Sequence, residues 1–297
     1  MESHNQLRGI VAMLLSGITF VINDSLMKIS MQDLPPYEVL VLRGIAGAVL
    51  AFIYLTYRGE ARFTKTLLTW PVALRALMEC VAILTYIIAL AHSPIGDVTA
   101  LFQTTPLLVI VGLVFLQGEK ASVLRFGLVL IGFIGALLVA QPGRGTVSGY
   151  VMLALVTAAF AAARDLAARK IAAEVPAMLS TFVLILTVLT GSTICSLLFE
   201  TWVMPSPAVF IAPLTAGLFM MLGHHFTLLA YRLANAQTVA PFYYSFMVFA
   251  VIAGYFLFGD VPNIIGFIGM AVIVLSGLAI LTIDKGERAD VFQSPDL

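Results

Sequence analysis

The sequence contains a long internal repeat. It runs first from Ala100 to Gly135, as Ala-Leu-Phe, a long apolar run, Gly-Glu and two spaced glycines. It recurs from Ala240 to Gly277, now beginning Ala-Pro-Phe and with Gly-Asp in place of Gly-Glu, and corresponding residues lie 140 to 142 positions apart. Each copy has two apolar segments joined by a short turn that carries a glycine and an acid. A repeat of this length makes a whole structural unit recur, so it constrains the fold more than any local motif.

The composition indicates the solvent in which these segments fold. Of the 297 residues, 61% are hydrophobic and 11% are charged, whereas soluble domains carry about a quarter charged residues. So little polar surface cannot cover a soluble globule, which predicts a multi-pass membrane protein with the lipid bilayer as a partner. The formal net charge is zero, which argues against nucleic acid as a partner.

Apolar runs of about 20 residues, the length that crosses a bilayer as a helix, occur ten times along the chain. The runs lack strand-like alternation, and open sheets cannot span lipid, so each run predicts a helix. The predicted fold is therefore all-α and integral to the membrane, with ten transmembrane helices. The expected spans are residues 8–29, 37–57, 70–91, 95–116, 122–141, 149–168, 178–199, 208–230, 238–258 and 262–283.

Lys and Arg are distributed unevenly between the two sides of these spans. One side carries Arg8, Arg58, Arg62, Lys65, Lys120, Arg125, Arg169, Lys170, Arg232, Lys285 and Arg288. The other carries little beyond Lys28 and Arg144. Cytoplasmic connections are enriched in Lys and Arg, so both termini are predicted to face the cytoplasm, as an even number of spans requires. The expected location is the inner (plasma) membrane.

The repeat extends to the first helix of each half. Asp24 and Lys28 match Asp165 and Arg169 at an offset of 141. The units are therefore residues 1–143 and 147–285, each of five helices, followed by a polar cytoplasmic tail, residues 286–297. Because five is odd, the second unit enters the membrane from the opposite face. Such inverted-topology repeats are typical of secondary transporters, which bind their substrates near the midplane between the halves.

At this point the chain resembles the drug/metabolite transporter superfamily, specifically its ten-helix EamA-type members. The resemblance is carried by the 5+5 organisation, the turns at 118–119 and 259–260, the spaced glycines and Pro106, and it covers residues 8–283. Asp260 departs from the Glu typical of the family, and Pro106 has no counterpart in the second copy. The resemblance implies secondary transport, and within the family the chain is most similar to amino-acid and metabolite exporters, including the aromatic-amino-acid type.

Ionisable and hydrogen-bonding residues inside spans are costly, which makes them candidates for a substrate site. The predicted substrate-binding residues are Asn23, Glu79, Tyr86, Gln103, His224 and Tyr244, with Tyr243 and His225 ranked behind them. Structural alternatives stay open. Arg75 and Glu79 are four residues apart, so they could neutralise each other along one helix. The aromatic side chains could equally be ordinary packing.

Two charged pairs are gate candidates because the inverted repeat places them at opposite faces. Asp24 and Lys28 form the first pair, and Asp165 and Arg169 form the second. One interpretation is that each pair neutralises charge along its own helix. The other is that each pair bonds to another helix when its side of the pathway closes, which would give two mutually exclusive closures.

No metal-ligand spacing, phosphate-binding loop or nucleophile motif occurs in the sequence, so no metal, cofactor or catalytic residue is predicted. The leading hypothesis is a secondary transporter that exports small amphiphilic metabolites, amino acids among them, by alternating access, with protons as a candidate coupling ion. The alternatives are an intramembrane enzyme that acts on lipids and an accessory scaffold protein. The sequence predicts neither the identity of the substrate nor the oligomeric state.

Overall fold

A computed structural model describes residues 2–60, 67, 69–117, 123–140, 149–168, 170–171, 175, 177–204, 206–234, 239 and 242–293. Throughout these ranges the regular elements are helices. They are α1 (Glu2–Ser30), α2 (Pro36–Tyr57), α3 (Trp70–His92), α4 (Ile95–Phe102), α5 (Thr105–Gln117), α6 (Val123–Ala140), the 3₁₀ helix η2 (Gly149–Met152), α7 (Leu153–Ala168), α8 (Ala177–Phe199), α9 (Pro207–Leu233), α11 (Ser245–Ala253), the π-helix η3 (Gly254–Phe258) and α12 (Ile264–Gln293).

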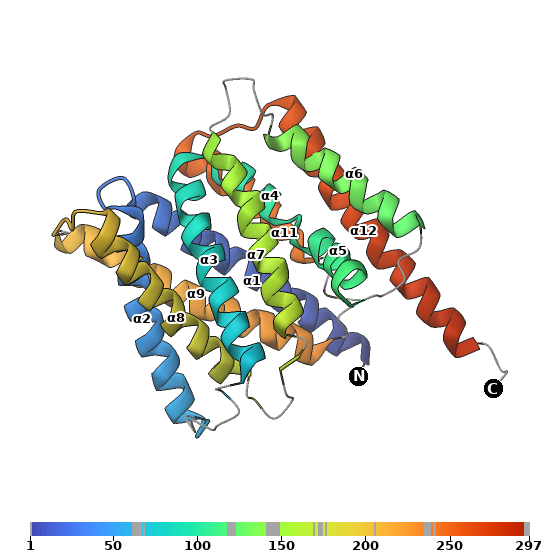
Figure 1. The fold of residues 1–297 in the computed structure, drawn as a ribbon, viewed down its shortest axis with the longest axis horizontal. Helices are drawn as coiled ribbons and strands as arrows, with labels where there is room; N and C mark the ends of the chain where they lie inside the picture. Colours follow the sequence, from blue (N-terminus) through green and yellow to red (C-terminus); the bar gives the residue numbers. More distant parts are fainter. Residues whose placement is uncertain are drawn as a thin grey trace.

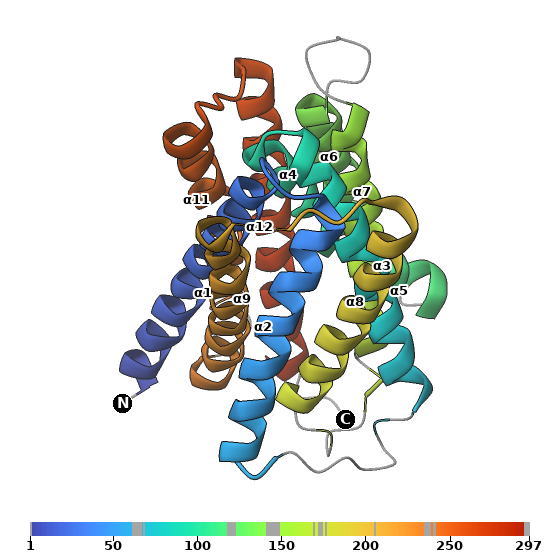
Figure 2. The same cartoon turned by 90° about the vertical axis from the view of Figure 1, so that its left-hand side faces the viewer.

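The helices are long and apolar enough to explain the membrane assignment. Within the described residues, seven could cross a bilayer, and three shorter apolar helices lie at 126–139, 245–258 and 264–280. Together these segments occupy the positions of the ten predicted spans. The all-helical membrane fold is thus confirmed, whereas the number of crossings and the cytoplasmic placement of the termini remain predictions. The beginning of α1 and the end of α12 lie at the same end of the bundle (Figures 1 and 2). We call this the end that carries the termini, and the opposite end the far end.

The two halves interlock rather than lie side by side. Helix α1 packs along α9, and α3 packs along α7. Since the repeat relates α1 to α7 and α3 to α9, these two contacts are copies of each other. Helix α2 packs against α8, and α6 runs alongside α12 (Figure 1), each being a contact between equivalent helices of the two halves. The contacts thus follow the internal repeat.

The spaced glycines of the repeat have different surroundings. A Cβ atom on Gly135 would lie 2.8 Å from the carbonyl oxygen of Gly269, and one on Gly269 would lie 2.6 Å from that of Gly135. Only glycine therefore allows α6 and α12 to approach this closely. A Cβ on Gly277 would overlap the Tyr244 hydroxyl, whereas one on Gly127 would meet nothing within 4 Å.

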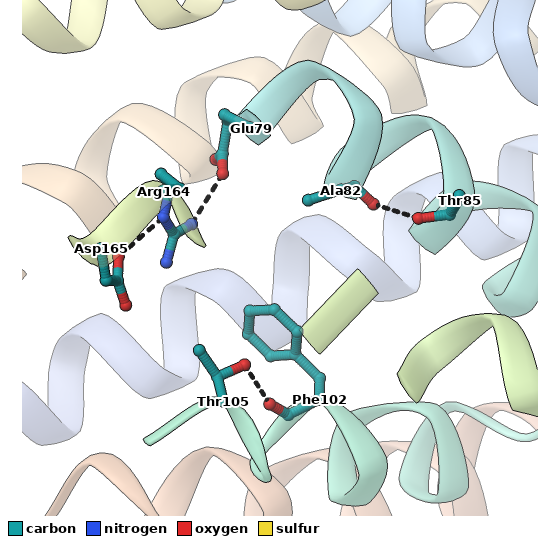
Figure 3. Close-up of polar contacts among 7 residues, drawn as sticks. All are labelled: Glu79, Ala82, Thr85, Phe102, Thr105, Arg164 and Asp165. Carbon is teal, nitrogen blue, oxygen red and sulfur yellow. Dashed lines mark hydrogen bonds and ion pairs between the residues drawn. The ribbon is translucent and has the colours of Figure 1, made fainter. Parts of the chain in front are cut away.

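The span that begins at Ile95 is interrupted after Phe102, where a two-residue turn separates α4 from α5. Pro106 explains the interruption because it has no N–H to donate to the carbonyl of Phe102. The hydroxyl of Thr105 donates to that carbonyl instead, at 2.6 Å (Figure 3). The sequence pattern predicted one unbroken helix here, since a hydropathy window averages over a turn of two residues.

The second half has an equivalent interruption without a proline at the position that matches Pro106. Tyr244 lies in a turn before α11, and the hydroxyl of Ser245 donates to the carbonyl of Phe242 at 2.6 Å. Ser245 and Phe242 each lie 140 residues after Thr105 and Phe102. The repeated feature is thus a hydroxyl that donates a hydrogen bond to a carbonyl of the preceding turn. Pro106 occurs in the first copy and has no counterpart in the second.

Candidate functional site

A cavity of about 650 Å³ lies between the two halves. Its wall is formed by α1, α2, α3, α4, α5, α7, α8, α9, α11 and α12 and includes apolar side chains such as Ile83, Leu107, Ile185 and Met220. The polar and aromatic-hydroxyl residues of the wall are Asn23, Asp24, Arg43, Arg75, Glu79, Tyr86, Thr105, Thr157, Arg164, Asp165, Thr181, His224, Thr227, Tyr231, Tyr243 and Tyr244. A wall of this kind suits a solute with both apolar and polar parts.

Arg164 joins charges from both halves in the cavity wall. Its Nη1 atom lies 2.7 Å from Oε2 of Glu79 on α3, and its Nε atom lies 2.8 Å from Oδ1 of the adjacent Asp165. Figure 3 shows the guanidinium between the two carboxylates. The Glu79 side chain is only 10% exposed, so the ion pair satisfies a carboxylate that would be costly to bury alone.

Arg75 does not follow the pairing that its spacing suggested. Its Nη1 donates to the hydroxyl of Ser180 on α8, while Glu79 is bonded to Arg164. Spacing along a helix favours an Arg75–Glu79 pair, but the partner that Glu79 finds comes from the other repeat. The ion pair therefore ties α3 to α7, which pack lengthwise.

Asp24 is held by hydrogen bonds from two side chains. The hydroxyl of Tyr86 donates to its Oδ2 at 2.6 Å, and the amide of Asn23 donates to its Oδ1 at 2.8 Å. All three residues are buried and line the cavity. This cluster links α1 to α3 on the cavity wall.

The aromatic part of the wall is built from several helices. Phe20 contacts His224 edge-on, with ring centroids 5.2 Å apart, and it also contacts Phe246 at 6.4 Å. Tyr86 and Phe102 meet edge-on at 5.8 Å. Such edge-to-face groups present ring surfaces that can pack against an apolar or aromatic solute.

Gln103 is the predicted site residue that the structure places outside the cavity wall. It is fully buried, and its Nε2 donates to the carbonyl oxygen of Tyr243 at 3.0 Å. Its side chain thus joins the helix interruption of the first half to that of the second. The other predicted residues, Asn23, Glu79, Tyr86, His224 and Tyr244, all line the cavity, as does Tyr243. His225 instead contacts Tyr54 edge-on at 6.0 Å. A binding role for any of these residues remains a prediction.

Arg43 and Arg164 line the cavity and lie within predicted spans, but neither is among the predicted site residues. An ionisable residue within a span is a functional candidate by default, and that signal could have found them. Within the described residues, no group of three or more His, Cys, Asp or Glu side chains is arranged to hold a metal ion.

The gate candidates have the following positions. Lys28 at the far end donates to the carbonyl of Ser93 at 2.7 Å, lies 3.4 Å from Oδ2 of Asp260, and lies over the ring of Phe258 at 4.9 Å. It thus bonds to other helices, while Asp24 bonds to Tyr86 and Asn23. In the second candidate pair, Asp165 bonds to Arg164, and Arg169 lies outside the described residues.

The chain matches the model of the EamA-like transporter family twice, over residues 7–141 and 148–282. It is 30% identical over 277 residues to the riboflavin transporter of Vibrio cholerae, covering 92% of each protein. It is 26% identical to the pseudopaline exporter CntI of Pseudomonas aeruginosa over 283 residues, 94% of this chain and 97% of the exporter. It is 24% identical to the S-adenosylmethionine uptake transporter of Rickettsia prowazekii over 291 residues, 97% of each.

A solved crystal structure has the same fold, with a TM-score of 0.63 over 95% of this chain and 98% of the other, at 21% identity. The two family matches divide the chain into two similar halves, in keeping with the repeat seen in the sequence. The family and these relatives are transporters rather than enzymes.

Proposed function

The chain belongs to the EamA-like transporter family, and from this premise we propose that it is a secondary transporter that exports small amphiphilic metabolites by alternating access. Amino acids with neutral or aromatic side chains are the first substrate class to test. The observation that carries the proposal is the 650 Å³ cavity between the halves, whose wall combines buried charges with aromatic rings. A zwitterion with an apolar side chain matches both parts of such a wall.

Alternating access requires that the cavity be closed at one end at a time. At the far end, Lys28 ties α1 to the ends of α3 and η3. Glu200 there accepts the backbone N–H groups of Tyr37 and Glu38 at the start of α2, at 2.8 and 3.0 Å. These bonds join the two halves at the far end and support a pathway closed on that side.

The other end of the cavity has more exposed walls. The side chain of Asp165 is 44% exposed and Tyr231 is 46% exposed, whereas Asp24 and Tyr86, nearer the far end, are each 6% exposed. This contrast supports a resting state that opens toward the end that carries the chain termini. For an exporter whose termini are cytoplasmic, that is the side from which substrate enters.

The direction of transport is part of the proposal because the relatives differ in it, one being named an exporter and another an uptake transporter. The purified protein, reconstituted in liposomes preloaded with unlabelled solute, should accumulate the same labelled solute by counterflow. The panel contains phenylalanine, tyrosine, tryptophan, riboflavin and S-adenosylmethionine. Each solute is assayed with and without a pH gradient, and empty liposomes are the control.

Counterflow of an amino acid supports the proposed substrate class, and a gain in rate with the pH gradient supports coupling to protons. Counterflow of riboflavin or S-adenosylmethionine alone would support transport as the function but refute amino acids as the substrate class. Chemical conversion of a solute or lipid without translocation would refute transport itself.

A further inference from the structure

Among the described residues of the cavity wall, Arg43 has no ionic partner, unlike Arg164. Arg75 also lacks an ion pair there, but its Nη1 donates to the hydroxyl of Ser180. It lies on α2, lines the cavity and is 6% exposed. Within the part of the chain that the structure describes, no carboxylate lies within 4.0 Å of its guanidinium, and its buried Nε has no hydrogen-bond partner. Arg164, by contrast, is paired with two carboxylates.

A buried guanidinium without a partner is expensive. Removing such a cation from water costs several kcal/mol unless a counter-charge and hydrogen bonds offset the cost. The guanidinium also carries five N–H donors in a planar fork that fits the two oxygens of a carboxylate. A cavity-lining residue of this kind is therefore best explained by an anion that arrives with the substrate.

The packing of α2 holds the backbone at Arg43 in place. A Cβ on Gly217 of α9 would lie 2.7 Å from the carbonyl oxygen of Arg43, and a Cβ on the adjacent Gly44 would lie 3.1 Å from Leu189 of α8. The helix is thus wedged between α8 and α9 at this turn. Such fixed placement lowers the entropy lost when a side chain binds a ligand.

Two acids interact electrostatically with Arg43 and could serve it instead of a ligand, Asp24 and Glu79. Glu79 is already paired with Arg164, which leaves Asp24. Its two carboxylate oxygens, however, already accept hydrogen bonds from Asn23 and Tyr86. Asp24 thus lowers the free-energy cost of burying the Arg43 cation, but it does not occupy the N–H donors of the guanidinium. The guanidinium remains available to a second carboxylate.

We propose that Arg43 binds a carboxylate of the transported solute, so that the substrates are amphiphilic carboxylates whose apolar part packs against the aromatic wall around Phe20 and Phe246. The inference rests on the proposed transport function and names its substrate class. It also predicts that Arg43 lowers the stability of the empty protein, because Asp24 offsets the charge only in part and the remaining cost is offset when substrate is bound.

The test uses the purified full-length protein in lipid nanodiscs at constant ionic strength. Phenylacetate carries a carboxylate and a ring, and phenylacetamide is its neutral counterpart of nearly the same shape. Wild type should bind the acid about tenfold or more tightly than the amide, as expected for a charge-assisted hydrogen bond. Arg43→Gln should lose this preference, and Arg43→Lys should retain part of it. Binding is read from the shift of the melting temperature with ligand concentration.

The ligand-free melting temperature supplies the second readout. Arg43→Gln should melt at or above the wild-type temperature because it removes an uncompensated buried charge. Arg164→Gln is the matched control, and it should melt lower because it strands the carboxylate of Glu79. If Arg43 were a structural partner of Asp24, both variants would melt lower than wild type.

Three results with phenylacetate, phenylacetamide and the variants would overturn the inference. These are equal binding of acid and amide by wild type, including no binding of either; a preference that survives in Arg43→Gln; and a melting temperature of Arg43→Gln that falls as far as that of Arg164→Gln. Tighter binding of phenyl phosphate than of phenylacetate would also overturn it, in favour of phosphorylated substrates. A carboxylate preference without counterflow of any solute would leave this inference standing and count against the transport function alone.

Discussion

At the scale of single residues, one ion pair between Glu79 and Arg164 connects the two repeats through the cavity wall. Its atoms are 2.7 Å apart, and the side chains are 10% and 19% exposed. Removing one partner of a buried pair typically costs about 3–5 kcal/mol. Here Asp165 also bonds to Arg164, so the cost of losing Glu79 should fall below that range.

We therefore predict that Glu79→Gln lowers the free energy of unfolding by about 2 kcal/mol, and that Arg164→Gln lowers it by about 3 kcal/mol. The double variant should lose less than the sum, because neither residue then leaves a stranded charge. Chemical or thermal unfolding of the four proteins in the same detergent measures this coupling. If the losses of the two single variants add up to that of the double variant, the interaction between Glu79 and Arg164 does not contribute to the free energy of unfolding.

The same variant separates the two roles of Glu79. If Glu79 carries protons, Glu79→Gln should abolish transport driven by a pH gradient and leave solute exchange intact. Equal loss of both activities would instead indicate a binding or structural role. The measurement compares exchange with gradient-driven flux in the same batch of proteoliposomes.

The residue scale is also where sequence reasoning was least complete. The spacing of Arg75 and Glu79 along one helix suggested a local pair, yet Glu79 bonds to Arg164 from the other half. Residue spacing indicates which side chains are neighbours on the same helix, whereas the partner of Glu79 is determined by the packing of α3 on α7. Arg43 could have been singled out as an ionisable residue in a span, but its lack of a partner is visible only in three dimensions.

At the scale of elements, the glycines of the repeat predict how closely α6 and α12 can pack. Gly135→Ala and Gly269→Ala would each place a methyl group within 3 Å of an opposing backbone oxygen, and overpacking of this kind costs about 1–3 kcal/mol. We expect both variants to melt lower than wild type. Gly127→Ala is the matched control on α6, because its methyl group would meet nothing within 4 Å. If all three variants melt alike, the close approach does not contribute to stability.

The positions of the elements followed from the sequence, but the interruptions within them did not. Apolar run length located the helices because lipid requires every span to be long and apolar. The turns before Thr105 and Ser245 depend on single hydroxyls that bond to Phe102 and Phe242. A hydroxyl in a span is also compatible with an unbroken helix, where it bonds to the preceding turn, so the sequence did not distinguish the two cases.

At the scale of the whole molecule, the predicted orientation can be tested with cysteines at the two ends of the bundle. Arg58 follows α2 at the end that carries the termini, and Met204, which is 95% exposed, follows α8 at the far end. With Cys80 and Cys195 replaced by alanine, Arg58→Cys should react with an impermeant maleimide only in inside-out vesicles. Met204→Cys should react only in intact cells. Five predicted spans separate the two positions, so reaction of both cysteines from the same side would contradict the ten-span topology.

The last prediction concerns the closure at the far end. Lys28 holds α1 to Ser93 and Asp260, and a partly exposed ion pair of this kind contributes about 1 kcal/mol or less. Its loss should therefore leave the fold intact and shift the balance between the two access states by up to about fivefold. We expect Lys28→Ala and Asp260→Asn each to increase labelling, from outside the cell, of a cysteine placed at Thr181 in the cavity.

Arg58→Ala removes an exposed ion pair with Glu60 at the other end and should change nothing. The exchange of charges in Lys28→Asp with Asp260→Lys should restore the wild-type labelling if the pair acts as a closure. Unchanged labelling in both single variants would show that the far end is held shut by other contacts, of which the bonds from Glu200 to the start of α2 are the next to test.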